Sequence, residues 1–416
     1  MKRWVNGKLL LLLGLVMVLA VTGCSGKSPE QGSKELTLNI GEVDAVSGPG
    51  AVYGSPQHDA IQMAVKEIND KGGVKVGGKT YKLNLVFYDD KADATEALSA
   101  VRKLIDRDGV KFIVGWGTSA STMAVVKAIG SEDAVMLVGT AAERSITSSG
   151  LPNVFRTRPP AGYTGVAAGK FIASQGKKKV AVIGQLKDAI YFQYYEQTKK
   201  AYLNGGGTII AEETFNTGDR DMYPQLTKII NMNPDALFVT GYVEQVAFVY
   251  RQARELGYKG QIYGFSGGSE EQFLKVVTSE AMEGNYDLRP VELTVEALGP
   301  NAQKFVDNYK KMFNKSPTPN APYAYDCVYV LKDALEKAGT VSDTKKVIEA
   351  LKGLKAPQEA VLKYMPVKGG GMFDENGQAF TSNVAMQWKS GKWTYAKELE
   401  SDVAGYSQQL KELKGK

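Results

Sequence analysis

The stretch KFIVGWGTSASTMAVVKAIGSEDAVMLVGTAAER, residues 111–144, decides the fold of this 416-residue chain. Two apolar runs, 112–114 and 134–138, each end in a turn of small residues, and a helical pattern separates them. This order is typical of a βαβ unit, whose right-handed crossover makes its two strands parallel. Both turns are therefore expected at the carboxyl edge of one sheet, where open α/β sheets bind ligands.

The two turns carry groups that suit a carboxylate ligand. Thr118 and Ser119 lie in the first turn, and the second reads Gly-Thr-Ala-Ala at 139–142. The helix that follows the first turn offers unpaired N–H groups and a partial positive charge. Capping of that helix by its own hydroxyls is the alternative explanation. Two such turns on adjacent strands, with Trp116 beside the first, favour a binding site.

The residues before this stretch show the same order of strand, turn and helix. A strand from residue 36 leads into the turn SGPGAVYG at 47–54. Ser55-Pro56 is predicted to be the cap and first residue of the next helix. A second strand, 83–88, ends in two aspartates. With the opening stretch, these elements predict a doubly wound sheet.

Three segments interrupt the alternation of strands and helices. They are interpreted as crossings between two lobes and span residues 153–163, 285–294 and the Gly-rich 367–380. The fold class is therefore α/β, with two doubly wound parallel-sheet lobes joined by three hinge crossings. Three helices after the second crossing have no strands of their own and are expected to cover the first sheet. Strands are predicted at 179–184, 208–213, 235–240 and 261–265, a hairpin at 384–396, and helices near 163–175, 192–204, 223–231, 244–256, 270–279, 302–313, 324–338 and 344–351.

The predicted lobes are each made of two segments. The first combines 36–155 with 290–362, and the second combines 156–289 with 363–416. A cleft between such lobes is a preferred ligand site, and hinges of several segments permit closure.

The first residues have the pattern of an export signal. A basic start precedes an apolar run at 9–20, which is too short for a comfortable membrane span. The following Val-Thr-Gly-Cys resembles a bacterial lipobox, which implies removal of 1–23 and lipidation of Cys24. Residues 24–35 have the composition of a tether. An uncleaved anchor is the alternative, and both interpretations place the body outside the cytoplasm, held to a membrane.

Composition argues against several functions. Without residues 1–23 the formal charge falls from +6 to +3, and no basic cluster suggests nucleic acid. His58 is the only histidine and is expected on the exposed face of the first helix, which excludes histidine triads and His-rich metal sites. Cys327 is expected to be a buried helix residue. The GxGxxxG string at 48–54 lacks the ribose-binding acid of a dinucleotide finger, so no cofactor and no metal are expected.

Aromatic side chains gather at the same predicted sheet edges. One aromatic at a strand end would be ordinary packing, but several together predict an aromatic-lined pocket. Those at or near strand ends are Tyr53, Trp116, Tyr191, Tyr242 and Phe265.

In their order and spacing, these motifs resemble the substrate-binding proteins of branched-chain amino acid ABC transporters. The resemblance spans nearly all of the chain after residue 24. It implies a type I periplasmic-binding-protein fold, a small-molecule ligand, an ABC permease as partner and no enzymatic activity. The motifs that support the resemblance include SGPGAVYG (47–54), AVKEINDKGGV (64–74), IVGWGTSAS (113–121), YVEQVAFVYRQARELG (242–257), YAYDCVYVLKDALEKAG (323–339) and FDENGQ (373–378).

The resemblance also implies roles for individual residues. Ser119 and the backbone of Thr140 and Ala141 would bind the ligand carboxylate, with Thr118 beside them. The pocket would be lined from the first lobe by Tyr53 and Trp116, and closed from the second by Tyr191, Tyr242, Phe265 and Ser266.

Two positions depart from the amino-acid binders, which usually have Thr where this chain has Ala142 and an ammonium-binding acid where it has Ser266. A buried ammonium without a counter-charge is costly. Amino acids, aromatic or aliphatic carboxylates, and amides or urea-like molecules therefore all remain open as ligands. A ligand-sensing module that acts with a separate receptor is the alternative function. Acids that could replace the missing one are Asp44, Glu244 and Asp326.

Overall fold

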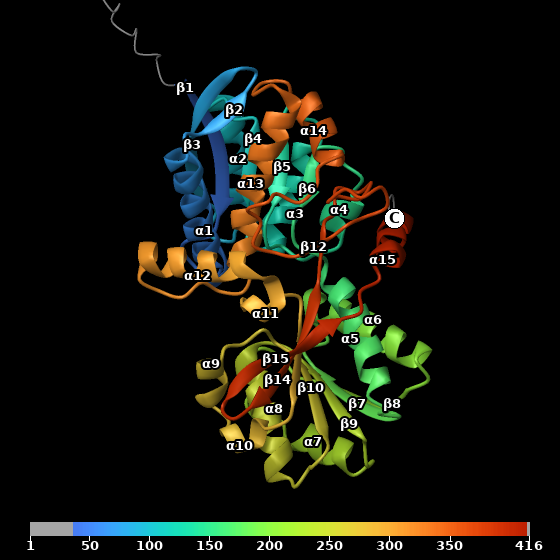
Figure 1. The fold of residues 1–416 in the computed structure, drawn as a ribbon. Helices are drawn as coiled ribbons and strands as arrows, with labels where there is room; N and C mark the ends of the chain where they lie inside the picture. Colours follow the sequence, from blue (N-terminus) through green and yellow to red (C-terminus); the bar gives the residue numbers. More distant parts are fainter. Residues whose placement is uncertain (1–35, 414–416) are drawn as a thin grey trace, which may run out of the picture. The chain divides into compact units, whose positions relative to one another are not determined.

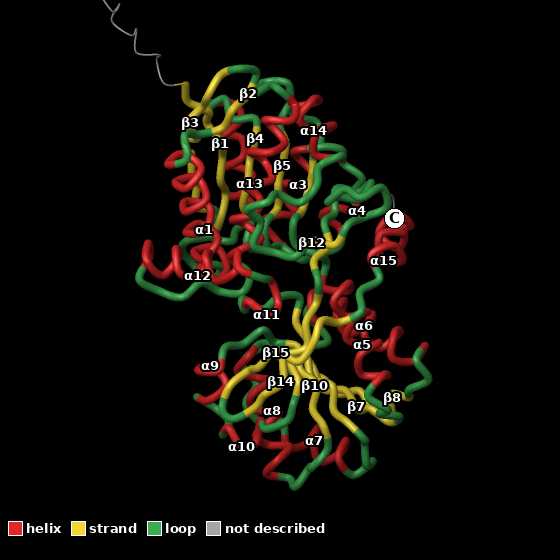
Figure 2. Tube along the Cα trace, in the orientation of Figure 1, coloured by secondary structure: helices red, strands yellow, loops and turns green. Residues whose placement is uncertain are grey.

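The structure, a computed structural model, describes residues 36–413. The predicted export signal, Cys24 and the tether lie outside the described residues. Within them, no helix combines the length and apolar character needed to cross a membrane. The predicted fold class is confirmed, because two sheets of mainly parallel strands are each covered by helices on both faces (Figures 1 and 2).

The first sheet has the order β2-β3-β1-β4-β5-β6. All its neighbouring strands pair in parallel except the antiparallel edge pair β2–β3. The parallel pairing of β4 with β5 confirms the prediction made from residues 111–144. Its strands are β1 (Leu36–Asp44), β2 (Val74–Val76), β3 (Lys79–Asp89), β4 (Phe112–Gly115), β5 (Val135–Val138) and β6 (Val154–Arg156).

Helices from distant parts of the chain cover the first sheet. Successive strand residues alternate between two cores: Phe112 and Val114 pack on one face, and Ile113 packs on the other. The three late helices return to this sheet as predicted. One face carries α1 (Ala51–Asp70), α12 (Pro300–Phe313), α13 (Ala321–Ala338) and α14 (Thr344–Lys352); the other carries α2 (Ala94–Arg102), the π-helical η1 (Lys103–Arg107), α3 (Ser119–Ile129) and α4 (Ser145–Ser148).

The second sheet has the order β15-β14-β11-β10-β9-β7-β8, with the predicted hairpin β14–β15 antiparallel at one edge. Its strands are β7 (Lys179–Gly184), β8 (Thr208–Thr214), β9 (Ala236–Thr240), β10 (Gln261–Phe265), β11 (Tyr286–Arg289), β14 (Asn383–Lys389) and β15 (Lys392–Leu399). Helices α5 (Ala161–Ser174) and α6 (Ala189–Asn204) pack on one face, and α7 (Tyr223–Ile230), α8 (Val243–Glu255), α9 (Glu270–Leu274) and α10 (Ser279–Met282) on the other. The remaining elements are α11 (Val295–Leu298), β12 (Tyr364–Met365), β13 (Phe380–Thr381) and α15 (Val403–Glu412).

Several elements differ from the predictions. Strands β6 and β11 lie inside segments interpreted only as crossings, because three or four residues show no readable periodicity. The single helix predicted at 270–279 is two helices, and Thr278 caps the second by accepting the Ala281 N–H (3.4 Å). Helix α15 was not predicted, and its Tyr406 packs against Tyr163.

Helix α1 begins at Ala51, so the prediction that Ser55-Pro56 starts it was wrong. Pro56 lies inside the helix, where it cannot donate to the carbonyl of Val52. Val52 is 67% exposed, so water can solvate that carbonyl and the helix tolerates the proline.

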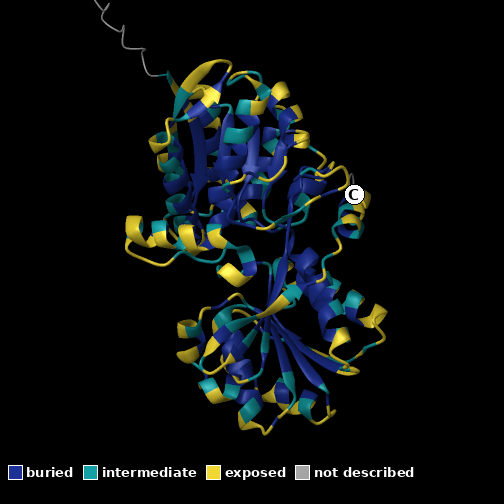
Figure 3. Ribbon diagram, viewed as in Figure 1, coloured by how far each residue is buried: buried dark blue, intermediate teal, exposed yellow. Residues whose placement is uncertain are grey.

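His58 is not on an exposed face, as was predicted. Its Nδ1 lies 2.9 Å from Oε2 of the fully buried Glu42, and its ring packs on Phe87 with centroids 4.2 Å apart. Burial raises the pKa of Glu42, although the bond to His58 partly opposes this. Cys327 is buried in α13, as predicted, with its Sγ 3.3 Å from Thr157 Oγ1. In Figure 3, the central strands of both sheets are mostly buried, and the exposed residues lie mainly on the outer helices and loops.

Candidate ligand-binding site

The first turn, after β4, is shaped by backbone at positive φ. Gly115 has φ 123° and Trp116 has φ 66°. A Cβ atom at Gly115 would lie 2.5 Å from the Val43 carbonyl oxygen, so only glycine fits. Left-handed backbone at a bulky residue such as Trp116 costs about 1–3 kcal/mol and is commonest at functional sites. Asp44 Oδ1 holds the turn by accepting the Gly117 N–H (2.8 Å).

Thr118 and Ser119 lie at the start of α3, but Thr118 does not cap it. The Thr118 hydroxyl donates to Ser121 Oγ (3.1 Å) and accepts no backbone N–H, so the capping explanation is wrong for Thr118. Ser119 Oγ accepts the N–H of Glu143 (3.3 Å), which joins the first turn to the end of the second.

The second turn is buried, and part of its backbone is engaged inside the protein. The Ala141 N–H, predicted to bind ligand, donates to the Trp116 carbonyl (3.2 Å) and ties the two turns together. The Thr140 carbonyl accepts a bond from Arg158 Nη1 (2.5 Å).

Tyrosines from both lobes converge beside these turns. Tyr53, in the first turn of α1, is 42% exposed and interacts with the hydroxyl of Tyr242, the N-cap residue of α8. Tyr191, in the first turn of α6, lies edge-to-face with Tyr242 (centroids 5.2 Å) and with Phe265 (6.2 Å). Burial, and then neighbouring Tyr242, raise the pKa of Tyr53. These four aromatic residues therefore form one cluster, as their positions after strand ends predicted.

Trp116 lies apart from this cluster. It is 0% exposed and packs in the core between the first sheet and α2 and α3. Within the described part of the chain, its indole Nε1 has no hydrogen-bond partner. Trp116 therefore shapes the turn from within the core.

Arg158 is a site residue that was missed from the sequence. It follows β6 in the string FRTRPP, and its guanidinium lies at the second turn. Burial lowers its pKa, and the neighbouring Tyr323, Tyr191 and Tyr53 oppose this. Two arginines in a predicted crossing were the available signal, but spacing alone did not distinguish a structural arginine from a ligand-facing one.

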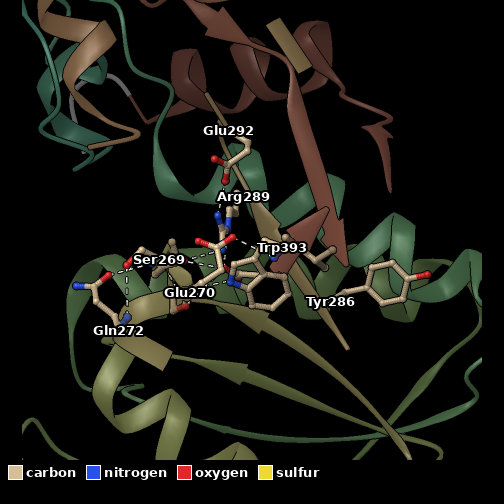
Figure 4. Close-up of polar contacts among 12 residues, drawn as sticks. Ser269, Glu270, Gln272, Tyr286, Arg289, Glu292 and Trp393 are labelled. Carbon is tan, nitrogen blue, oxygen red and sulfur yellow. Dashed lines mark hydrogen bonds and ion pairs between the residues drawn. The ribbon is translucent and has the colours of Figure 1, made fainter. Parts of the chain in front are cut away.

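The turn that holds Ser266 rests on a buried ion pair. Asp287 accepts the Ser266 N–H (3.2 Å) and the Gly267 N–H (3.3 Å). Arg289 donates from Nε to Asp287 Oδ2 (2.7 Å) and from Nη2 to the Gly268 carbonyl (2.8 Å). Figure 4 shows Arg289 between Glu292 and the ring of Trp393, whose centroid lies 5.0 Å from it. Arg289 is therefore shared between Asp287, which holds the Ser266 turn, and Glu292.

Each of the three acids considered as replacements has other interactions. Asp44 is fully buried, and burial followed by the nearby Glu42 and Asp90 raises its pKa well above the ordinary value. Glu244 pairs with the exposed Arg220 (3.2 Å). Asp326 accepts the N–H groups of residues 361 and 362 at 2.9 and 3.1 Å. No group of three or more His, Cys, Asp or Glu that could hold a metal ion occurs within residues 36–413.

Asp326 is expected to make the free energy of unfolding fall as pH rises. Burial raises its pKa from 3.8 to about 7, while the backbone N–H groups it accepts act in the opposite direction. A raised carboxyl pKa means that the native state binds the proton more tightly, so stability declines between these two values. Urea unfolding across that range should show a weaker decline in Asp326→Asn than in wild type. Parallel curves would contradict the assignment.

Comparison with known proteins places this chain and its fold in a family. The periplasmic binding protein family model matches residues 37–392. The leucine-, isoleucine-, valine-, threonine- and alanine-binding protein of Pseudomonas aeruginosa is 30% identical over 319 residues, covering 76% of this chain and 82% of that protein. Leu/Ile/Val-binding protein BraC3 of Rhizobium johnstonii is 30% identical over 358 residues, covering 85% and 92%.

A solved structure is consistent with this family. The branched-chain amino acid transporter substrate-binding protein LivJ from Streptococcus pneumoniae, in complex with isoleucine, matches with a TM-score of 0.70. It is 26% identical and covers 88% of this chain and 100% of that one. The chain therefore belongs to the periplasmic binding proteins, among the substrate-binding proteins of the branched-chain amino acid ABC transporter type. This is a family of solute-binding proteins and not of enzymes.

Proposed function

We propose that this protein is an extracytoplasmic solute-binding lipoprotein that captures a small organic ligand and delivers it to an ABC permease. The ligand would be an amino acid or a related carboxylate or amide. The observation that carries the proposal is the convergence of Tyr53 from the first lobe with Tyr191 and Tyr242 from the second. They meet beside two polar turns at the carboxyl edge of the first sheet, the position at which open α/β sheets bind ligands.

The site residues have distinct proposed roles. Ser119 and Thr140 bind the polar head of the ligand, while Ala141 and Trp116 hold the two turns in place. The other residues proposed to contact the ligand are Tyr53, Thr118, Tyr191, Tyr242, Phe265 and Ser266.

Membrane attachment belongs to the same proposal. The lipobox-like Val-Thr-Gly-Cys supports lipidation at Cys24, and residues 24–35 would link the lipid to the binding domain. The alternative, a ligand sensor that acts with a separate receptor, shares every binding residue. Stimulation of a partner permease's ATPase by the loaded protein would favour transport, and stimulation only of a receptor would favour sensing.

Thermal unfolding of residues 25–416 against a ligand panel tests the binding role. A ligand present at about 100 times its dissociation constant should add about 2.7 kcal/mol of stability. The panel would contain amino acids, aromatic and short-chain acids, amides and urea. Conversion of a bound compound into a product would contradict the proposal.

Ser119→Ala is expected to weaken ligand binding by about 1–3 kcal/mol, because a hydrogen bond to a charged group is lost. Calorimetric titration with the ligand found in the panel would measure the change. Ser131→Ala, at the other end of α3, is the matched control, since the Ser131 hydroxyl bonds only locally to the Ala128 carbonyl (3.5 Å). Unchanged affinity in Ser119→Ala would overturn the role of this hydroxyl.

A further inference from the structure

We propose that the ligand of this site is a carboxylate without an ammonium group, and that Arg158 binds that carboxylate. The inference rests on the proposed function and specifies its ligand class. It follows from the position of one cation, from what surrounds it, and from the interactions of the nearby acids.

Arg158 is held in place at the second turn. Pro159 follows it and restricts its backbone by excluding helical conformation. The Gln378 side chain donates from Nε2 to the Arg158 carbonyl (2.8 Å), and Arg158 Nη1 donates to the Thr140 carbonyl (2.5 Å). The guanidinium therefore lies against the turn that the sequence predicted to bind a carboxylate.

The guanidinium of Arg158 lacks an anionic partner. Its Nε is inaccessible to solvent and has no hydrogen-bond acceptor among residues 36–413. In the part of the chain that the structure describes, no ion pair joins it to a carboxylate. Arg156, two residues earlier, provides the contrast, because acceptors meet all three of its guanidinium nitrogens. An unpaired, partly buried cation is unfavourable, and a bound carboxylate would correct this with charge-assisted bonds.

The groups that face Arg158 suit an organic acid. Tyr53, Tyr191 and Tyr323 are its electrostatic neighbours. Their rings can pack on a hydrocarbon body, and a phenol hydroxyl can donate to a carboxylate oxygen. The surroundings of Arg158 thus combine one positive charge with aromatic side chains.

Two acids near the site already have structural roles. Asp287, beneath Ser266, is paired with Arg289. Asp188 lies near Tyr53 and Tyr191, and it caps α6 by accepting the N–H groups of Ile190 (2.9 Å) and Tyr191 (3.3 Å). An ammonium group would therefore lie near the Arg158 cation, while the acids described above already serve an arginine and a helix cap.

The test compares three compounds that share one carbon skeleton: 4-methylpentanoate, leucine and 4-methylpentanamide. Benzoate and benzamide form an aromatic pair with the same logic. We expect both carboxylates to bind and the amides and leucine to bind at least tenfold more weakly. If leucine or an amide binds as tightly as its carboxylate, the inference is overturned while the proposed function stands, and Asp188 becomes the residue to mutate. If no compound of the full panel binds, the proposed function fails and the inference fails with it.

Arg158→Gln tests the assigned residue. We expect a 10- to 100-fold loss of affinity for the carboxylate with little change for the amide, so that the ratio of the two affinities collapses. Arg158→Lys should restore part of that ratio, because it restores the charge without the planar fork. Arg220→Gln, a change at an exposed arginine on the second lobe, should leave the ratio unchanged. An equal loss for both compounds in Arg158→Gln would show a structural role only and overturn the assignment.

Discussion

Arg156→Ala is expected to lower the free energy of unfolding by about 3–5 kcal/mol, because several buried acceptors lose their donor at once. The side chain is fully buried. It donates to Gln378 Oε1 (2.7 Å) and to the Ala141 and Glu143 carbonyls (3.2 and 2.6 Å). Burial lowers the pKa of Arg156 to about 9, so it remains charged near neutral pH.

Chemical denaturation would measure this loss, with Arg102→Ala as the control. Arg102 is an exposed arginine paired with Glu132, and such surface pairs contribute about 0–1 kcal/mol. Arg156→Lys should be intermediate, because an ammonium group cannot reach all of the acceptors. A change in Arg156→Ala as small as that in the control would show that water replaces the lost donor.

Gly54→Ala is expected to cost about 3 kcal/mol of stability through overpacking. An added Cβ atom would lie 2.1 Å from the Ala45 carbonyl oxygen and 2.7 Å from its backbone nitrogen, and backbone cannot rotate away as a side chain can. Helix α1 would have to move outward, and it would carry Tyr53 with it. Ligand affinity should therefore fall together with stability.

Ser55→Ala, at the next position of α1, is the control for Gly54→Ala. Unfolding in denaturant and titration with the bound ligand would be measured on both variants. If Gly54→Ala lost stability but kept wild-type affinity, Tyr53 would not depend on the position of α1.

Much of the fold could be predicted because its signals are local. The stretch 111–144 contains both strands, both turns and the helix of one βαβ unit, so its pattern is complete within itself. Strand β6 could not be predicted, since its three residues become a strand only through pairing with β5. His58 was misplaced for a similar reason, because its buried partner Glu42 lies on another element.

The aromatic cluster of the candidate site was more predictable than the surroundings of its individual residues. Strand ends correctly predicted that Tyr191, Tyr242 and Phe265 lie together, because parallel strands bring their carboxyl ends to one edge, and Tyr53 joins them from the other sheet. The burial of Trp116 depends on a left-handed backbone angle that no spacing reveals. The position of Arg158 depends on Gln378, which is far away in the sequence.

The covering of the first sheet by α13 has a consequence for the order of folding. Tyr325 on α13 donates to Glu67 on α1 (2.6 Å), across 258 residues of sequence. The face of the first sheet that α1 covers in part therefore stays incomplete until most of the chain has left the ribosome. Contacts of such long range form slowly, and exposed apolar strands favour aggregation meanwhile. The first lobe to begin synthesis thus cannot be completed until α13 and α14 have been made, long after its own strands, which makes a chaperone most useful to its early residues.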